Sequence, residues 1–240
     1  MQIETAFFSY QGGRDYNEDS VRCVSENGAC AVVVADGLGG HGGGQIASAI
    51  VVDRLTDDFM RTKALDTAYV TDLFRRVNAQ VLEAQTPTQR MKSTGVALYI
   101  KDQSLLWGHV GDTRLYYFQG GMLVSQTLDH SVSQMAVYAG EITVEQIRHH
   151  ADRSRVLRAF GMEEGFRTEF SRVLTLSPGF HAFLLCTDGF WEYVWETEMA
   201  SDLAKATSPH NWLETMKSRL LKRVPKDNDN YSAAAVFIHV

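Results

Sequence analysis

Four aspartates at the ends of apolar segments are the residues of this chain whose type and spacing could do chemistry. Asp36 follows the apolar run 31–35 and opens the glycine-rich stretch DGLGGHGGG. Asp112, Asp188 and Asp229 stand at the ends of other apolar runs, far along the chain. A single aspartate at such a position usually caps a turn through its own side chain. Four that converge would repel one another unless a cation lay among them, so we expect a metal site around Asp36.

The donor atoms expected at this site are all oxygens, and such a set suits Mg²⁺ or Mn²⁺ better than zinc. Zinc would require histidine or cysteine, and only His41 of the eight histidines lies among these segments. The cysteines form no CxxC pair and lie in or beside apolar runs, which predicts reduced core residues. They are Cys23, Cys30 and Cys186.

The elements that must position these acids follow from the hydrophobic periodicity. The Val-rich run before Asp36 predicts a buried strand that stops at the acid, paired with the strand 21–24 through an Asn-Gly turn. Apolar residues at i, i+4 spacing predict helices over 45–60 and 66–84. The other expected strands are 3–10, 95–100, 104–110, 114–118, 122–125, 173–176, 181–187 and 233–240, and helical segments are expected over 131–160 and 209–222.

This order of elements predicts an α+β fold in which two mainly antiparallel sheets are stacked and flanked by helices. The 240 residues fit one domain, since no Pro- or Ser-rich linker divides them, and a 45% hydrophobic share supports a sizeable core. A net charge of −6 without a Lys/Arg cluster argues against a nucleic-acid or membrane-surface partner. With no signal peptide and no bilayer-length apolar run in the sequence, we expect a cytoplasmic monomer.

Six short motifs occur in the order found in the metal-dependent type-2C Ser/Thr protein phosphatases. Each motif alone is weak, but six in the same order over most of a domain are specific. The resemblance is to the bacterial members and runs from about residue 12 to the end. The motifs are Arg14-x-x-Asn17-Glu18-Asp19, Asp36-Gly-x-Gly-Gly-His41, Gly111-Asp112-Thr-Arg114, Asp129-His130-Ser131, Thr187-Asp188-Gly189 and Asp229-Asn230-Tyr-Ser232.

The resemblance implies an α-β-β-α sandwich with a two-metal site in a cleft at one end. Asp36 resembles the carboxylate that bridges two core Mn²⁺ or Mg²⁺ ions, and Gly37 would offer its main-chain oxygen to one of them. Asp188 and Asp229 resemble the ligands of the first ion.

The remaining site residues are carried over in the same way. Asp19, together with Glu18, resembles the acid that holds the second ion through its waters. Asp112 matches the ligand of a third, weaker ion found in bacterial members. Arg14 resembles the arginine that binds the substrate phosphate through its planar fork. His41 is a candidate general acid or substrate contact, and a solvated loop residue is an equal alternative.

These roles imply a protein phosphatase that hydrolyses phosphoserine and phosphothreonine. A hydroxide shared by the two core ions would attack phosphorus in line, and no protein nucleophile would be needed. Residues 131–170 would form the flap that selects the phosphoprotein substrate. The enzyme would oppose a bacterial Ser/Thr kinase.

Two other readings of the chain are weaker. The stretch from Gly37 to Gly42 satisfies GxGxxG and could belong to a dinucleotide-binding domain, but antiparallel hairpins follow it where repeated βαβ units would be expected. A catalytically weak, phosphatase-like regulatory module is the second alternative. Such a module would normally have lost metal ligands, and here none is missing.

Overall fold

The computed structural model describes residues 1–39 and 43–240, and in it two antiparallel sheets stack face to face. The first sheet has seven strands with the main order β10-β6-β5-β3-β2, while β4 pairs with β3 and β9 pairs with β6. Its strands are β2 (Asp19–Glu26), β3 (Ala29–Leu38), β4 (Lys92–Ser93), β5 (Gly95–Lys101), β6 (Ser104–Val110), β9 (Glu169–Phe170) and β10 (Leu174–Thr175).

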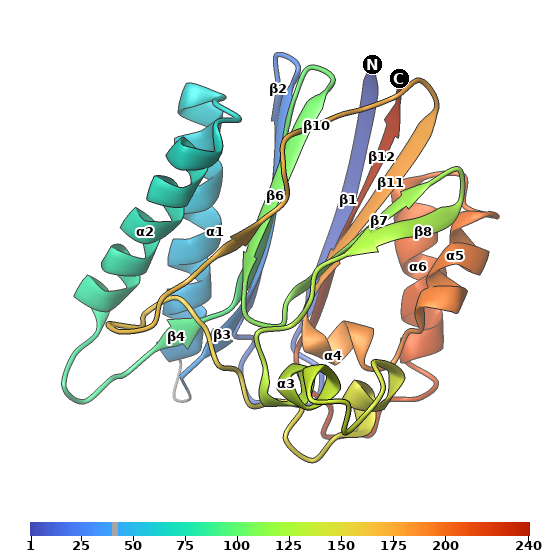
Figure 1. The fold of residues 1–240 in the computed structure, drawn as a ribbon. Coiled ribbons are helices and arrows are strands. Elements are labelled where there is room, and N and C mark those ends of the chain that lie inside the picture. Colours follow the sequence, from blue (N-terminus) through green and yellow to red (C-terminus); the bar gives the residue numbers. More distant parts are fainter. Residues whose placement is uncertain (40–42) are drawn as a thin grey trace.

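The second sheet has five strands in the order β1-β12-β11-β7-β8. The first and last long strands of the chain are therefore neighbours, and both termini lie at the same end of the sandwich (Figure 1). Its strands are β1 (Gln2–Tyr10), β7 (Arg114–Gln119), β8 (Met122–Gln126), β11 (Phe180–Cys186) and β12 (Tyr231–His239).

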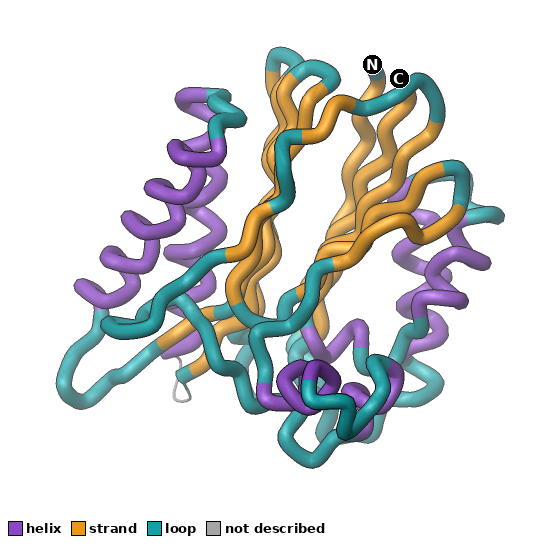
Figure 2. The backbone as a smooth tube through the Cα atoms, viewed as in Figure 1, coloured by secondary structure: helices purple, strands orange, loops and turns teal. Residues whose placement is uncertain are grey.

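Helices cover the outer face of each sheet, which gives four layers (Figures 1 and 2). α1 (Gly43–Thr62) and α2 (Thr67–Ala84) cover the seven-stranded sheet. α5 (Glu196–Leu203) and α6 (Pro209–Leu220) cover the five-stranded sheet. None of the described helices is long and apolar enough to cross a membrane. Three short helices lie at the end of the sandwich opposite the termini: α3 (Val132–Tyr138), the 3₁₀ helix Glu145–His149 and α4 (Asp188–Trp191).

The alternation of side chains along β3 divides the core into layers. Val32 and Val34 pack between the two sheets, whereas Ala31 and Val33 face α1 and α2. A strand buried on both faces needs apolar residues at every position, and this explains the unbroken run that precedes Asp36. A third cluster fills the space between the five-stranded sheet and α4 to α6.

The predicted fold class is confirmed, as are the helices expected over 45–60, 66–84 and 209–222. The prediction that the strand stops at Asp36 is wrong, because β3 continues to Leu38 by pairing with β4. The prediction that 131–160 is helical holds only for α3 and the 3₁₀ helix. Since every strand pairing among residues 1–39 and 43–240 is antiparallel, the sheets exclude a dinucleotide-binding βαβ domain.

Candidate active site

A cavity of about 590 Å³ opens where the glycine-rich end of β3 meets the start of α4. It collects six of the eight residues that the sequence predicts for the site, although they come from five separate segments of the chain. Those six are Arg14, Asp36, Gly37, Asp112, Asp188 and Asp229. Glu18 also lines the cavity, whereas Asp19 does not border it. His41 lies outside the described residues.

Strand pairing places Asp36 and Asp19 together. They are direct partners in the antiparallel β2–β3 pair. The main-chain oxygen of Asp36 accepts hydrogen bonds of 2.9 Å from the amide of Thr94 and the hydroxyl of Ser93, so its backbone is held from the other side as well. Asp19 is buried, and its Oδ2 accepts a 2.9 Å hydrogen bond from the hydroxyl of Thr187. Asp19 is therefore placed behind the cavity wall, between the two sheets.

A close backbone approach brings Asp188 and Asp229 to the same cavity. Asp188 begins α4, and Asp229 lies just before β12. Between them, a Cβ added at Gly189 would lie 2.0 Å from the main-chain oxygen of Asn230. Only glycine allows the two segments to come this close, which explains the glycine of the Thr187-Asp188-Gly189 motif.

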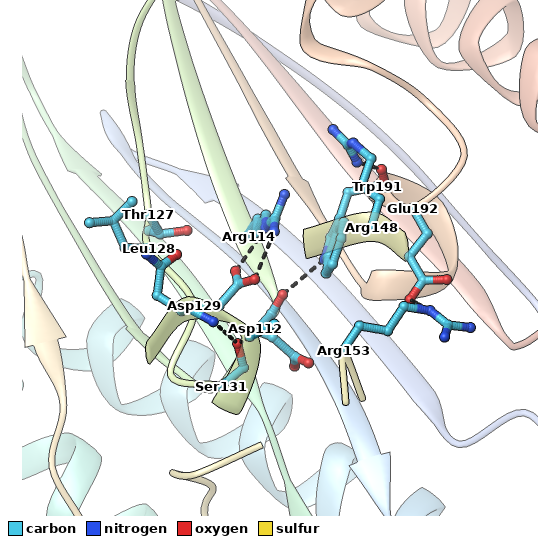
Figure 3. A network of polar contacts seen from close by, with 12 residues as sticks. Asp112, Arg114, Thr127, Leu128, Asp129, Ser131, Arg148, Arg153, Trp191 and Glu192 are labelled. Atoms are coloured by element: carbon cyan, nitrogen blue, oxygen red, sulfur yellow. Dashed lines mark hydrogen bonds and ion pairs between the residues drawn. The ribbon is translucent and has the colours of Figure 1, made fainter. Parts of the chain in front are cut away.

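Asp112 reaches the cavity from the turn between β6 and β7. The turn depends on Gly111, whose φ of +97° is unfavourable for residues with a side chain. The carboxyl group of Asp112 is almost fully buried, with 3% of the residue exposed. This position is fixed by a network of polar contacts that also involves Trp191 and Arg114 (Figure 3).

Burial and the charges of neighbouring acids raise the pKa of four of these carboxyl groups. Burial, followed by the charges of Asp188, Asp19 and Asp112, raises the pKa of Asp36 well above its ordinary value. Burial and then the charges of Asp112 and Asp229 have the same effect on the pKa of Asp188. Burial chiefly raises the pKa of both Asp19 and Asp112 to about 7. Each carboxylate is thus costly in its charged form while no cation lies beside it.

The donor set fits a hard divalent cation. Within the described residues, Oδ1 of Asp19 is buried and has no hydrogen-bond partner, which is unusual for a carboxyl oxygen. Carboxylate and main-chain oxygens are the ligands preferred by Mg²⁺ and Mn²⁺. Asp36, Gly37, Asp188 and Asp229 supply such oxygens around one open cavity.

Arg14 makes a contact that the sequence does not predict. Its Nε and Nη2 donate hydrogen bonds of 3.0 and 2.8 Å to the two carboxylate oxygens of Asp229. This contact is the main cause that raises the pKa of the Arg14 guanidinium. Because 55% of the Arg14 side chain is exposed at the cavity, the arginine remains within reach of solvent there. Its role in phosphate binding stays a prediction.

Glu18 is tied to the start of α1. Its Oε1 accepts a 3.1 Å hydrogen bond from the amide of Gly44, and its main-chain oxygen accepts one from Gly37 at 3.1 Å. Of the two neighbouring acids, Glu18 is therefore the one that faces the cavity, whereas Asp19 lies behind it.

Asn230 is a structural residue of the site to which the sequence assigns no role. Its Nδ2 donates to the main-chain oxygens of Gln11 and Tyr16 at 2.7 and 2.8 Å, and its Oδ1 accepts from the amide of Glu18 at 2.8 Å. One amide group thus fastens the loop that carries Arg14 to the segment that carries Asp229. Its place in the Asp229-Asn230 motif is the signal that could have indicated this role.

A second group of potential metal ligands lies elsewhere among the described residues. His109, His130 and Glu169 bring three donor atoms within 4.8 Å of one another. However, Nδ1 of His130 accepts a hydrogen bond from the amide of Gly111, so its proton is on Nε2, which donates to Glu169 at 3.1 Å. Nε2 of His109 is likewise bonded to the main-chain oxygen of Leu128 at 2.9 Å. These hydrogen bonds occupy the nitrogens that a metal would need, which favours a neutral histidine pair.

Comparisons with known proteins agree with this geometry. The family described as "Protein phosphatase 2C" matches residues 11–225. The chain is 33% identical over 202 residues to the serine/threonine phosphatase stp of Listeria welshimeri, covering 80% of this chain and 79% of that protein. The solved serine/threonine phosphatase PstP/Ppp of Mycobacterium tuberculosis superimposes with a TM-score of 0.82 at 28% identity over 99% of both chains.

A further solved structure, the catalytic domain of PstP in complex with two manganese ions, has a TM-score of 0.78 at 26% identity and covers 98% of this chain and 97% of that one. The sandwich and its acid-lined cavity therefore define a metal-dependent phosphoprotein phosphatase. The chain belongs to the protein phosphatase 2C family of serine/threonine phosphatases.

Proposed function

We propose that two divalent cations bind in this cavity, with Asp36 as the carboxylate shared by both. Asp188 and Asp229 would complete the first site, and the main-chain oxygen of Gly37 would serve one of the two ions. Asp19, together with Glu18, would hold the second ion through its waters. The observation that carries this proposal is the convergence of acids from separate segments on one open cavity, where their own charges and burial oppose ionisation. Mn²⁺ and Mg²⁺ both suit such oxygen ligands.

The bound cations would supply an activated water as nucleophile and would neutralise charge on the phosphoryl oxygens. The chain's own residues would orient the phosphorylated side chain. Arg14, at the cavity edge, would bind two phosphate oxygens with its planar fork once it leaves Asp229. Ser154 and Val156 line the cavity from the segment 131–170, which would act as the flap beside the substrate.

Asp112 and Asp188 would share a third, weaker cation. Asp112 lines the cavity. Burial is the largest cause of the raised pKa of Asp188, and the charge of Asp112 is the second. Two carboxylates that line the same cavity are stabilised in their charged form when a cation lies between them.

The wider setting of the enzyme is part of the same proposal. Residues 1–240 would work as a single catalytic domain and a monomer in the cytoplasm. The substrate would be a phosphorylated protein, and a Ser/Thr kinase would be the opposing enzyme. The solved and curated relatives that carry the name serine/threonine phosphatase favour an active enzyme over a catalytically weak regulatory module.

The direct experiment is hydrolysis by metal-stripped protein. After exhaustive EDTA treatment and dialysis, the enzyme should be inactive towards p-nitrophenyl phosphate and a phosphothreonine peptide. Activity should return with Mn²⁺ or Mg²⁺, since the cavity offers only oxygen ligands to the cation. Hydrolysis that survives EDTA treatment would contradict the proposal, whereas Zn²⁺ as the sole activating ion would contradict the oxygen ligand set.

A further inference from the structure

The indole of Trp191 contacts the main chain of Asp112. Its Nε1 donates a 2.9 Å hydrogen bond to the main-chain oxygen of Asp112 (Figure 3). Both residues are almost completely buried, at 1% and 3% exposure. Trp191 is the last residue of α4, and Asp188 is the first. The short helix α4 thus carries Asp188 and also holds the backbone of Asp112 through Trp191.

The indole itself has little freedom to move. The guanidinium of Arg114 lies 3.5 Å from the centre of the ring, in the range of a cation–π contact, and is fixed by hydrogen bonds of 2.8 and 2.7 Å to Asp129. Arg148 donates to the main-chain oxygen of Trp191 and pairs with Glu196 at 2.6 Å. Arg148 comes from the 3₁₀ helix within the segment 131–170, so that segment is fastened to the same tryptophan.

The Asp112 segment needs a restraint of this kind. Asp112 and Asp188 line the same cavity, and Asp112 follows the positive-φ turn at Gly111. Like charges in one cavity repel each other and so favour a wider separation of the segments that carry them. The indole hydrogen bond opposes this separation, because it fixes Asp112 to the same helix that carries Asp188.

We propose that Trp191 is a positioning residue that sets the separation of Asp112 and Asp188 and thereby the affinity of the third, weaker cation. This inference rests on the proposed function, because it requires that divalent cations bind in the cavity. Trp191 does not contact the substrate, and the affinity for the two core cations does not depend on the indole.

The chain offers a matched control in Trp212 of α6. Its Nε1 donates a hydrogen bond of the same length, 2.9 Å, to the main-chain oxygen of Met199, and it is fully buried in the same core cluster. Trp191→Phe and Trp212→Phe therefore each remove one buried indole donor. Only the first of the two acceptors belongs to a residue of the cavity.

The test is Mn²⁺ binding to the wild type and both variants by calorimetry, with thermal unfolding recorded in parallel. Both variants should lose similar stability. Trp191→Phe should weaken the low-affinity phase of Mn²⁺ binding by about three- to tenfold, the usual effect of one lost hydrogen bond, and leave the tight phase unchanged. Trp212→Phe should bind Mn²⁺ as the wild type does. Equal Mn²⁺ binding by the two variants would overturn the role of Trp191.

A second measurement uses the wild-type protein and remains decisive if Trp191→Phe does not fold. Indole N–H signals are followed by ¹H–¹⁵N NMR during a Mg²⁺ titration and assigned with single Phe substitutions at the other three tryptophans. The Trp191 signal should shift in the low-affinity phase, whereas the Trp212 signal should stay in place. This inference is overturned if the Trp191 signal does not shift in the low-affinity phase, or if the titration shows only two bound ions. Either result leaves the proposed two-ion function intact. A wild type that binds no divalent cation overturns both.

Discussion

At the scale of single residues, the site is a set of carboxyl groups that the fold holds in unfavourable surroundings. Asp19 shows this most clearly, since it is buried, has one oxygen without a hydrogen-bond partner among the described residues, and faces Asp36 across a strand pair. Such an arrangement costs stability in the absence of a cation and gains it when one binds. The cost should be measurable as a dependence of stability on pH.

Asp19→Asn should therefore stabilise the metal-free protein, and more so at high pH. Burial raises the pKa of Asp19 to about 7 in the folded protein. Between about pH 4 and about pH 7, the folded state keeps a proton that the unfolded chain has lost, so the stability of the wild type falls as pH rises through this window. The free energy of unfolding, measured by urea denaturation in EDTA, should favour the variant increasingly from pH 4.5 to 7.5. A difference that is constant with pH would contradict the assignment.

Arg14→Ala should weaken substrate binding and spare metal binding. Loss of a charge-assisted clamp on phosphate should lower kcat/KM for a phosphothreonine peptide by roughly 10- to 100-fold, mainly through KM. Mn²⁺ affinity should not fall, because the variant releases Asp229 from its ion pair. Arg22→Ala is the control, since Arg22 also pairs with two aspartates, at 2.8 and 2.7 Å, but does not line the cavity. Equal kcat/KM values for the two variants would show that Arg14 is only a surface charge with no role in phosphate binding.

At the scale of elements, strand register and one close approach determine the site. The β2–β3 register sets Asp19 against Asp36, and the contact of α4 with the segment before β12 joins Asp188 to Asp229. The hairpin that contains the first pair could be predicted, because an Asn-Gly turn fixes its register. The extension of β3 past Asp36 could not, since it depends on a two-residue partner strand, β4, with no pattern of its own.

Gly189→Ala should separate Asp188 from Asp229. The new methyl group would meet the main-chain oxygen of Asn230 at 2.0 Å, so the backbone must shift. We expect Mn²⁺ affinity and hydrolysis to fall together, with a loss of stability of roughly 1–3 kcal/mol, as is typical of overpacking. Gly43→Ala is the control, because the nearest atom to a Cβ there among the described residues is Met91 Cβ, at 3.4 Å. Wild-type Mn²⁺ affinity in Gly189→Ala would show that the close approach does not set the site.

At the scale of the whole molecule, the sandwich brings together acids that are far apart in sequence. The order of the six motifs and the alternation of strands and helices were enough to predict the fold class and the convergence on Asp36. The contacts of Arg14 with Asp229 and of Trp191 with Asp112 were not predictable. They join residues 215 and 79 positions apart and depend on how the sheet ends meet, which no local pattern encodes.

The most direct test of the account is Mn²⁺ binding to Asp36→Asn, measured by calorimetry beside hydrolysis of a phosphothreonine peptide. Because Asp36 would be shared by both core cations, the variant should lose tight Mn²⁺ binding and fall in turnover by about 100-fold or more. Asp112→Ala is the matched control, since it removes a buried acid of the same cavity. It should keep the tight pair of ions and turn over more slowly. Binding of two Mn²⁺ ions by Asp36→Asn with wild-type affinity would contradict the account.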